Sequence, residues 1–327
     1  MKTVRQANQL ALCVLIAWLV APPDTAYAQD YPTRPVRLIV PTSPGGGTDI
    51  SARIVAPKLS EYLGRQVVVE NRAGASTMIG VEHVARAAPD GYTLLMGISS
   101  LAIIPYTHTN VPYDPVKDFA PVSQVVVVPL ILAAHPSLPA RSVKQLIAFA
   151  KARPGQLNFS AGSPGGNPHM AMELLLSMSG LKMVHVPYKG QGPGLVALVA
   201  GHVSLAMANI LGALPHVKTG RLRAIGVTSA KRAIAAPDVP TIAEAGVAGY
   251  EVVQWFGILA PANTPRDIIA KLHAGTARVL QDAAVKQRFL NDGGEPVGNT
   301  PDAFAAVIRA DLKKWSTLIR NAGIRLE

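Results

Sequence analysis

The stretch from Val36 to Tyr62, VRLIVPTSPGGGTDISARIVAPKLSEY, decides the fold that the sequence predicts. Its first five residues are an apolar run that is typical of a buried strand. Pro41–Gly47, called the first loop below, holds three glycines and breaks regular structure. Thr48 is expected to be the N-cap of the following helix, and Asp49 places negative charge in its first turn. The stretch therefore predicts a strand, a glycine-rich turn and a helix.

Such a turn can bind an anion, because its backbone N–H groups and the helix N-terminus both carry partial positive charge. The sequence of the first loop matches neither the dinucleotide-binding motif G-x-G-x-x-G nor the G-K-[ST] end of a P-loop. A tight connection that binds no ligand fits the same residues. The stretch alone leaves these two interpretations open.

Residues 1–28 have the pattern of a secretory signal peptide. Lys2 and Arg5 form a basic start, Leu10–Ala21 is an apolar run too short to span a bilayer, and Ala26–Ala28 resembles a cleavage site. We therefore expect an exported, periplasmic protein that begins at Gln29.

The remaining chain is long enough for two domains of ordinary size. The full sequence has a formal charge of +11, which would steer anions toward it. Its basic residues are dispersed and only 5% of its residues are aromatic, so we expect no nucleic-acid partner. The only cysteine, Cys13, lies in the predicted signal peptide.

Strand and helix patterns alternate after the first helix, which favours a parallel sheet with helices on its faces. The opening pattern then recurs: Ala161–Pro168, the second loop, opens a helix at His169. A third such loop, Tyr188–Gly194, follows. Two α/β lobes could thus present backbone N–H groups to one small ligand between them.

Two long apolar runs are expected to cross between the lobes, Val122–Ala134 and Glu251–Leu259. They place residues 29–127 in the first lobe and 128–254 in the second. Residues 255–327 then return to the first lobe with C-terminal helices.

The candidate ligand-binding residues lie in the helix-opening loops and at strand ends. They are Thr42, Ser43, Gly45, Gly46, Gly47, Thr48, Ser99, Ser160, Gly162, Ser163, Gly165, Gly166, Asn167, His169, Tyr188, Lys189 and Asn209. Purely structural roles could explain the same residues. Hydroxyl groups in turns often bond to their own backbone, and glycines can be required for backbone conformation alone. His169 could instead cap or pack, and Lys189 could be solvated.

No constellation for catalysis or metal binding is present in the sequence. The eight histidines form no H-E-x-x-H pair, and no G-x-S-x-G occurs. We therefore expect no catalytic residues, no metal and no cofactor.

Ordered motifs along the chain resemble the Bug family, the periplasmic solute receptors of tripartite tricarboxylate transporters. The motifs are Val40-Pro41 with Gly46-Gly47 and Asp49, Asn71-Arg72, Pro89-Asp90-Gly91-Tyr92-Thr93-Leu94, Asp118-Phe119-Ala120-Pro121-Val122, Val186-Pro187-Tyr188-Lys189-Gly190, Pro240-Thr241 and Leu259-Ala260-Pro261. The resemblance runs from about Tyr31 to the C-terminus.

The resemblance implies a two-lobed α/β periplasmic-binding-protein fold of the Venus-flytrap, type II-like kind, with a mainly parallel sheet in each lobe. It implies a monomer that holds a di- or tricarboxylate or an aromatic acid between its lobes, mainly through Thr42–Thr48 and Ser160–Asn167. A two-component membrane permease would receive the ligand. Many relatives have acidic residues near Ala197, Ser204 or Asn209, and their absence here argues against amino-acid ligands.

Two other functions stay open from the sequence. The protein could report ligand binding to a membrane sensor instead of feeding a transporter. It could also be an exported enzyme acting on organic acids, although no catalytic set supports this.

Overall fold

The stretch from Val36 to Tyr62 forms the strand, turn and helix that its residues predict. Strand β1 (Val36–Val40) is almost wholly buried, and helix α2 (Gly47–Leu63) follows the first loop. The N-cap is Gly46 rather than Thr48, because Gly45 adopts φ +80° and the extended Gly46 (φ −86°, ψ 167°) brings the chain into the helix at Gly47. Thr48 therefore lies inside the first turn.

The computed structural model describes residues 31–322, and all features reported below lie in the compact unit that begins at Arg34. The predicted signal peptide lies outside the described residues. The further elements are β2 (Val67–Asn71), η1 (Ala75–Thr77), α3 (Met78–Ala85), β3 (Thr93–Ile98), η2 (Ser99–Ala102), α4 (Ile104–Thr107), β4 (Phe119–Ala134), α5 (Val143–Lys151), β5 (Asn158–Ser160), α6 (Asn167–Ser179), β6 (Val184–Val186), α7 (Gln191–Val199), β7 (Leu205–Asn209), α8 (Ile210–Lys218), β8 (Arg223–Val227), β9 (Val253–Pro261), α9 (Arg266–Gln281), α10 (Ala283–Asp292), β10 (Glu295–Pro296) and α11 (Pro301–Ala322).

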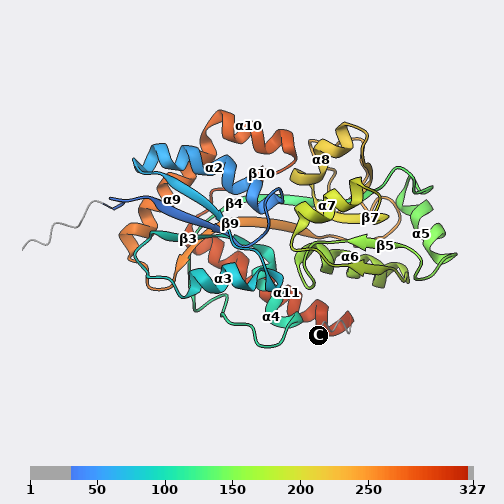
Figure 1. The fold of residues 1–327 in the computed structure, drawn as a ribbon, viewed down its shortest axis with the longest axis horizontal. Coiled ribbons are helices and arrows are strands. Elements are labelled where there is room, and N and C mark those ends of the chain that lie inside the picture. The colour runs from blue at the N-terminus through green and yellow to red at the C-terminus, as the bar shows by residue number, and fades with distance from the viewer. Residues whose placement is uncertain (1–30, 323–327) are drawn as a thin grey trace, which may run out of the picture. The chain divides into compact units, whose positions relative to one another are not determined.

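The first lobe is built on strands in the order β2-β1-β3-β9-β4. Strand β1 is parallel to β2 and β3, as the alternation of strands and helices predicts. Strand β9 is antiparallel to both β3 and β4. In Figure 1, α2 and α10 lie above these strands, whereas α3, α4 and α11 lie below them.

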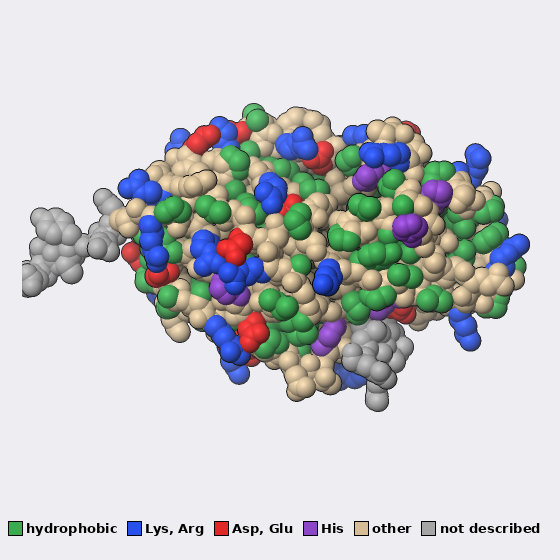
Figure 2. Space-filling model, in the orientation of Figure 1, with side chains coloured by type: hydrophobic (Ala, Val, Ile, Leu, Met, Phe, Trp, Pro, Cys, Tyr) green, Lys and Arg blue, Asp and Glu red, His purple; other side chains and the backbone are tan. Residues whose placement is uncertain are grey.

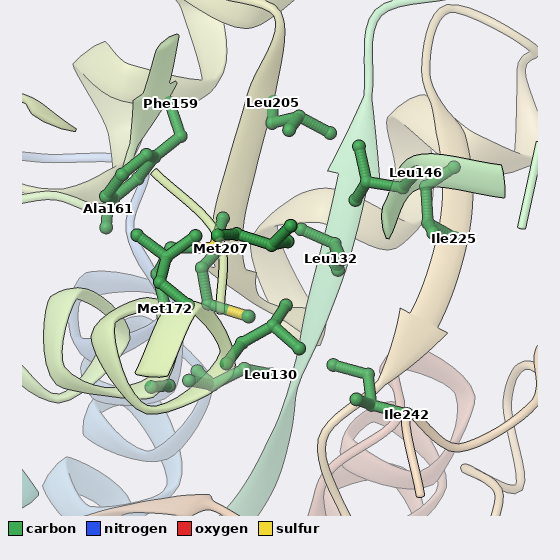
Figure 3. Close-up of a cluster of buried hydrophobic side chains, with 14 of the residues drawn as sticks. Leu130, Leu132, Leu146, Phe159, Ala161, Met172, Leu205, Met207, Ile225 and Ile242 are labelled. Carbon is green, nitrogen blue, oxygen red and sulfur yellow. The ribbon is translucent and has the colours of Figure 1, made fainter. Parts of the chain in front are cut away.

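The second lobe continues from β4 through β7 and β5 to β6, with β8 also beside β4. Strand β5 is parallel to β6 and β7, whereas β4 is antiparallel to β7 and β8. Its core is a layer of buried side chains between the sheet and the helices α5 and α6. Figure 3 shows Leu130 and Leu132 of β4 beside Met207 of β7 and Met172 of α6.

Strand β4 belongs to both lobes, because it pairs with β9 over its first part and with β7 and β8 over its last. Each lobe thus combines parallel strands with antiparallel pairs made by the long strands. The α/β, two-lobed fold expected from the sequence is confirmed. The lobe boundaries near residues 127 and 254 stay predictions.

Charged side chains are scattered over the face drawn in Figure 2, with acidic groups beside several of the basic ones. Among the described helices, none has the length and apolar character needed to cross a membrane.

Candidate functional site

A small pocket lies where the first, second and third loops meet. The free volume at its centre is about 30 Å³, enough for roughly two water molecules. It is lined by Thr42, Gly46, Gly47, Thr48, Thr77, Ile98, Ser100, Ala161, Gly162, Ser163, Gly166, Pro168, Gly190, Gln191, Asn209 and Gln254. We call it the inner pocket.

Five helices begin at the wall of the inner pocket. The lining residues Gly46, Thr77, Gly166, Gly190 and Asn209 are the N-caps of α2, α3, α6, α7 and α8. Each helix N-terminus carries partial positive charge from its aligned peptide dipoles and its unbonded N–H groups. The backbone therefore makes the pocket electropositive from both lobes.

The side chains that line the inner pocket add no charge of their own to this potential. Within residues 31–322, the side chains that line the inner pocket are all uncharged. A bound anion would be balanced by helix N-termini, whereas a bound cation would face them without a counter-ion. The arrangement thus favours an anionic ligand.

Asp49, in the first turn of α2, holds the first loop in place through hydrogen bonds. Its carboxylate accepts hydrogen bonds from Gly45 N (3.0 Å), Arg53 Nε (2.9 Å) and Asn71 Nδ2 (3.0 Å). Asn71 Nδ2 also donates to the carbonyl of Thr42 (3.0 Å). Burial alone would raise the pKa of Asp49, but Arg53, the Gly45 N–H and Asn71 together hold this pKa below its usual value. Asp49 is therefore ionised, and its hydrogen bonds fix the conformation of the first loop.

The second loop repeats this construction with a different side chain. Gly165 has φ +69°, close to the +80° of Gly45. Its N–H donates to Nδ1 of His169 at 3.0 Å, across the same four-residue span that joins Gly45 to Asp49. The sequence allowed His169 to cap or pack but did not indicate this bond to Gly165, because Asp and His do not resemble each other, although Pro-Gly-Gly precedes both.

The third loop closes the pocket from the second lobe. Oε1 of Gln191 accepts from the backbone N–H of Asn209 (2.9 Å) and from the Asn209 side-chain amide. Oδ1 of Asn209 accepts from Gly212 N (3.0 Å), the usual N-cap bond. Gln191 and Asn209 thus form one fixed unit at the wall.

The structure brings eight of the predicted residues to the inner pocket. These are Thr42, Gly46, Gly47, Thr48, Gly162, Ser163, Gly166 and Asn209. Their location fits a ligand role, which stays a prediction.

Nine predicted residues do not line the inner pocket: Ser43, Gly45, Ser99, Ser160, Gly165, Asn167, His169, Tyr188 and Lys189. Several have other bonds for their side chains. The hydroxyl of Ser160 donates to the Gly194 carbonyl (3.2 Å), and that of Ser43 donates to the Lys189 carbonyl (2.6 Å). His169 is buried and braces the second loop, which is the packing alternative stated above.

Tyr188 and Lys189 line a neighbouring pocket of about 210 Å³, called the outer pocket. It also includes Gly74–Ser76 and Pro164, and it shares Ser163 with the inner pocket. These two residues therefore lie beside the inner pocket, and a ligand role for them stays a prediction.

Eight lining residues are not among the seventeen candidates: Thr77, Ile98, Ser100, Ala161, Pro168, Gly190, Gln191 and Gln254. Of these, Ala161 lies within Ser160–Asn167, the range that the resemblance implies for binding. Gly190 and Gln191 lie in the third loop, whose composition already indicated a helix start. Thr77 and Gln254 lie in segments without any such pattern. The described residues include no group of three or more His, Cys, Asp or Glu side chains placed to hold a metal.

Comparison with known proteins adds the following relatives. A family model described as "Tripartite tricarboxylate transporter family receptor" matches residues 51–324. Protein BugT of Bordetella pertussis is 38% identical over 329 residues, which cover 100% of both chains.

Two solved structures of Rhodopseudomonas palustris proteins are also similar. Rpa4515, solved with adipate, is 37% identical with a TM-score of 0.88, covering 90% of this chain and 100% of its own. MatC, solved with bound malate, is 31% identical with a TM-score of 0.85, covering 88% and 100% respectively.

Proposed function

We propose that this chain, which belongs to the tripartite tricarboxylate transporter receptor family, captures a small carboxylate between its two lobes in the periplasm. The observation that carries the proposal is the convergence of five helix N-termini on a pocket lined by uncharged side chains. That electrostatic pattern suits a carboxylate and disfavours a cation.

The family consists of solute-binding receptors, and the chain is accordingly a receptor rather than an enzyme. The exported enzyme considered from the sequence is thereby set aside. Binding without turnover needs only a site that opens, encloses its ligand and opens again, and two lobes joined by long strands can do this.

The ligand class follows from the pocket and finds support in the relatives. The first and second loops each present N–H groups beside a helix N-terminus, as a carboxylate requires. Two relatives have been solved with dicarboxylates, adipate and malate. We assign a di- or tricarboxylate or an aromatic acid to the chain, bound by those of the seventeen predicted residues that line the inner pocket.

Delivery to a two-component integral membrane permease completes the proposed function. The receptor would be a monomer, exported by the signal peptide 1–28 and cleaved after Ala28. Its lobes would comprise residues 29–127 with 255–327, and residues 128–254. Closure around the ligand would give the permease a bound state to recognise.

A thermal-shift screen of residues 29–327 against mono-, di-, tri- and aromatic carboxylates tests the proposal. A ligand that binds only the native state raises the melting temperature with its concentration. We expect a large shift with one or a few acids and none with the corresponding amines. Folded, ligand-free protein that responds to no acid would contradict the proposal.

A further inference from the structure

The first and second loops are held by side chains that respond differently to acid. The Gly45 N–H donates to the carboxylate of Asp49 at 3.0 Å, and the Gly165 N–H donates to Nδ1 of His169, also at 3.0 Å. Burial raises the pKa of Asp49, but the hydrogen bonds that it accepts outweigh burial and hold this pKa below its usual value. An imidazole, in contrast, ordinarily gains a second proton near pH 6.5. Of the two acceptors, His169 is therefore the one that changes charge near neutral pH.

The bond to Gly165 requires the neutral form of His169. A backbone N–H can only donate, so Nδ1 must carry a lone pair, and the ring proton lies on Nε2, 3.4 Å from Oε1 of Glu173. A second proton would go to Nδ1 and would face the Gly165 N–H, donor against donor. His169 is only 3% exposed, so water does not supply the lost acceptor. Protonation of His169 therefore breaks the bond that holds Gly165.

A displacement of Gly165 would move one wall of the inner pocket. Its neighbour Gly166 is the N-cap of α6 and lines the pocket together with Ser163. The Gly166 N–H donates to the Ser163 carbonyl at 3.1 Å, so the turn that contains Gly165 fixes both lining residues.

The same turn also contacts the first lobe. The backbone of Gly165 packs so closely that a Cβ at this position would clash with the Thr107 hydroxyl and the ring of His108. Two residues further, the Asn167 N–H donates to Oγ of Ser100 at 3.0 Å. The position of the second loop therefore affects both the pocket and the contact between the lobes.

Titratable side chains face His169 from its own helix, from β6 and from the first lobe. Glu173 of α6 lies at Nε2, the ring of His185 is stacked on that of His169 with centroids 3.9 Å apart, and His108 lies beside Gly165. Burial, together with His169, lowers the pKa of His185 to about 3 and also lowers the pKa of His108. A charge is thus disfavoured on both neighbouring rings, whereas a charge on His169 would face the carboxylate of Glu173.

We infer that His169 is a positioning residue whose neutral imidazole sets the second loop for binding, so that acid weakens capture of the ligand. This inference rests on the proposed function, because the ligand is taken to be the carboxylate proposed above. It adds a proton-linked control of affinity to that function.

The test compares the native protein with His169→Asn by calorimetry at pH 7.5 and pH 5.0, with adipate, malate, citrate and benzoate as probes. The asparagine oxygen can accept from Gly165 across the same four-residue span that Asp49 uses, but it does not titrate. Protonation of the probe itself is the same for both proteins. Between the two pH values, the native protein should lose about tenfold more affinity than the variant, as one unmade buried hydrogen bond allows. Equal losses would overturn the inference and leave the proposed function standing.

Two further variants separate the hydrogen bond from packing and from the neighbouring ring. His169→Leu fills the space without an acceptor, so it should bind about tenfold more weakly than His169→Asn at pH 7.5 and show no additional loss at pH 5.0. His108→Gln removes the other ring beside Gly165 and should keep the pH dependence of the native protein. Equal affinities of the leucine and asparagine variants, or a loss of the pH dependence in His108→Gln, would contradict the assignment to His169.

Nuclear magnetic resonance of the ligand-free native protein tests the same step without any acid. Between pH 7.5 and 5.0 the amide resonance of Gly165 should move together with the ring resonances of His169, whereas that of Gly45 should stay constant because Asp49 remains ionised. A Gly165 resonance that does not move would overturn the inference. If no probe binds at pH 7.5, the proposed function fails, and this titration alone decides whether His169 positions the second loop.

Discussion

The hydroxyl of Ser43 in the first loop donates a hydrogen bond of 2.6 Å to the carbonyl of Lys189 in the third loop. The two loops belong to different lobes, so this bond joins the lobes beside the inner pocket. The carbonyl of Pro44 lies so near Gly192 that a Cβ at Gly192 would clash with it. The closed arrangement is therefore held by close backbone contact and by a hydrogen bond across the cleft.

Replacing Ser43 by Ala should accelerate ligand release. The variant loses one lobe-to-lobe hydrogen bond, which is worth about 0.5–1.5 kcal/mol, so affinity should fall about twofold to tenfold, mainly through the dissociation rate. Stopped-flow kinetics with the best acid from the screen would measure this.

Ser60→Ala is the control for Ser43→Ala. The Ser60 hydroxyl donates to Ala56 O and accepts from Val67 N, both inside the first lobe. Its loss should lower stability without changing the dissociation rate. Identical release rates for the native protein and Ser43→Ala would show that the rim bond does not hold the ligand.

Gly46→Val should abolish binding while the fold persists. Gly46 has φ −86° and ψ 167°, which valine adopts readily, so the backbone tolerates the change. A Cβ at this position already lies 3.8 Å from Gly192 N and 3.9 Å from Gln191 Cβ, and the methyl groups beyond it would meet the opposite lobe.

Gly46→Ala serves as the graded companion of Gly46→Val. Its single methyl makes only ordinary contacts, so binding should weaken much less. Calorimetry gives the affinities, and circular dichroism with thermal melting checks the fold. Native affinity in Gly46→Val would remove the first loop from the site.

The two loops could be predicted from sequence because their chemistry is local. Pro-Gly-Gly permits a left-handed glycine followed by an extended one, and both Gly45-Gly46 and Gly165-Gly166 adopt this conformation. The loops follow predicted strands and open predicted helices, so their place at the end of a parallel sheet also follows.

Thr77 and Gln254 could not be predicted because their position depends on long-range packing. Thr77 ends a run of three non-glycine residues with positive φ, Ala75–Thr77, which side-chain propensity would not favour. Gln254 lies in an otherwise apolar strand, and only the pairing of β9 with β4 brings its amide to the pocket. The antiparallel strands β4 and β9 were expected as crossings, but their pairing partners were not.

Asp49→Ala should destabilise the protein and loosen the first loop. The variant leaves the donors on Gly45, Arg53 and Asn71 without their shared acceptor, at a cost of about 2 kcal/mol at neutral pH. Because the folded pKa of Asp49 lies below its unfolded value near 3.8, its contribution is complete above that pH and is lost as the pH falls through the folded pKa. Urea titrations at pH 7 and in acid should show that the difference in the free energy of unfolding between the native protein and the variant becomes smaller as the pH falls. If this difference stays constant with pH, the contribution of Asp49 to stability does not depend on its ionisation.

His185→Phe should make the protein less sensitive to acid. Burial, with nearby His169, lowers the pKa of His185 to about 3, although a hydrogen bond to the Gly162 backbone opposes the shift. The unfolded chain binds this proton near pH 6.5, so between pH 6.5 and 3 the unfolded state holds more protons and the free energy of unfolding falls as pH decreases. Phenylalanine keeps a ring in the stack with His169 (centroids 3.9 Å apart) and Phe159 (5.2 Å) but cannot titrate. Its unfolding free energy, measured in urea from pH 7 to 4, should decline less steeply than that of the native protein. Parallel curves would show that His185 does not govern the acid response, because the removed imidazole is the only group that differs between the two proteins.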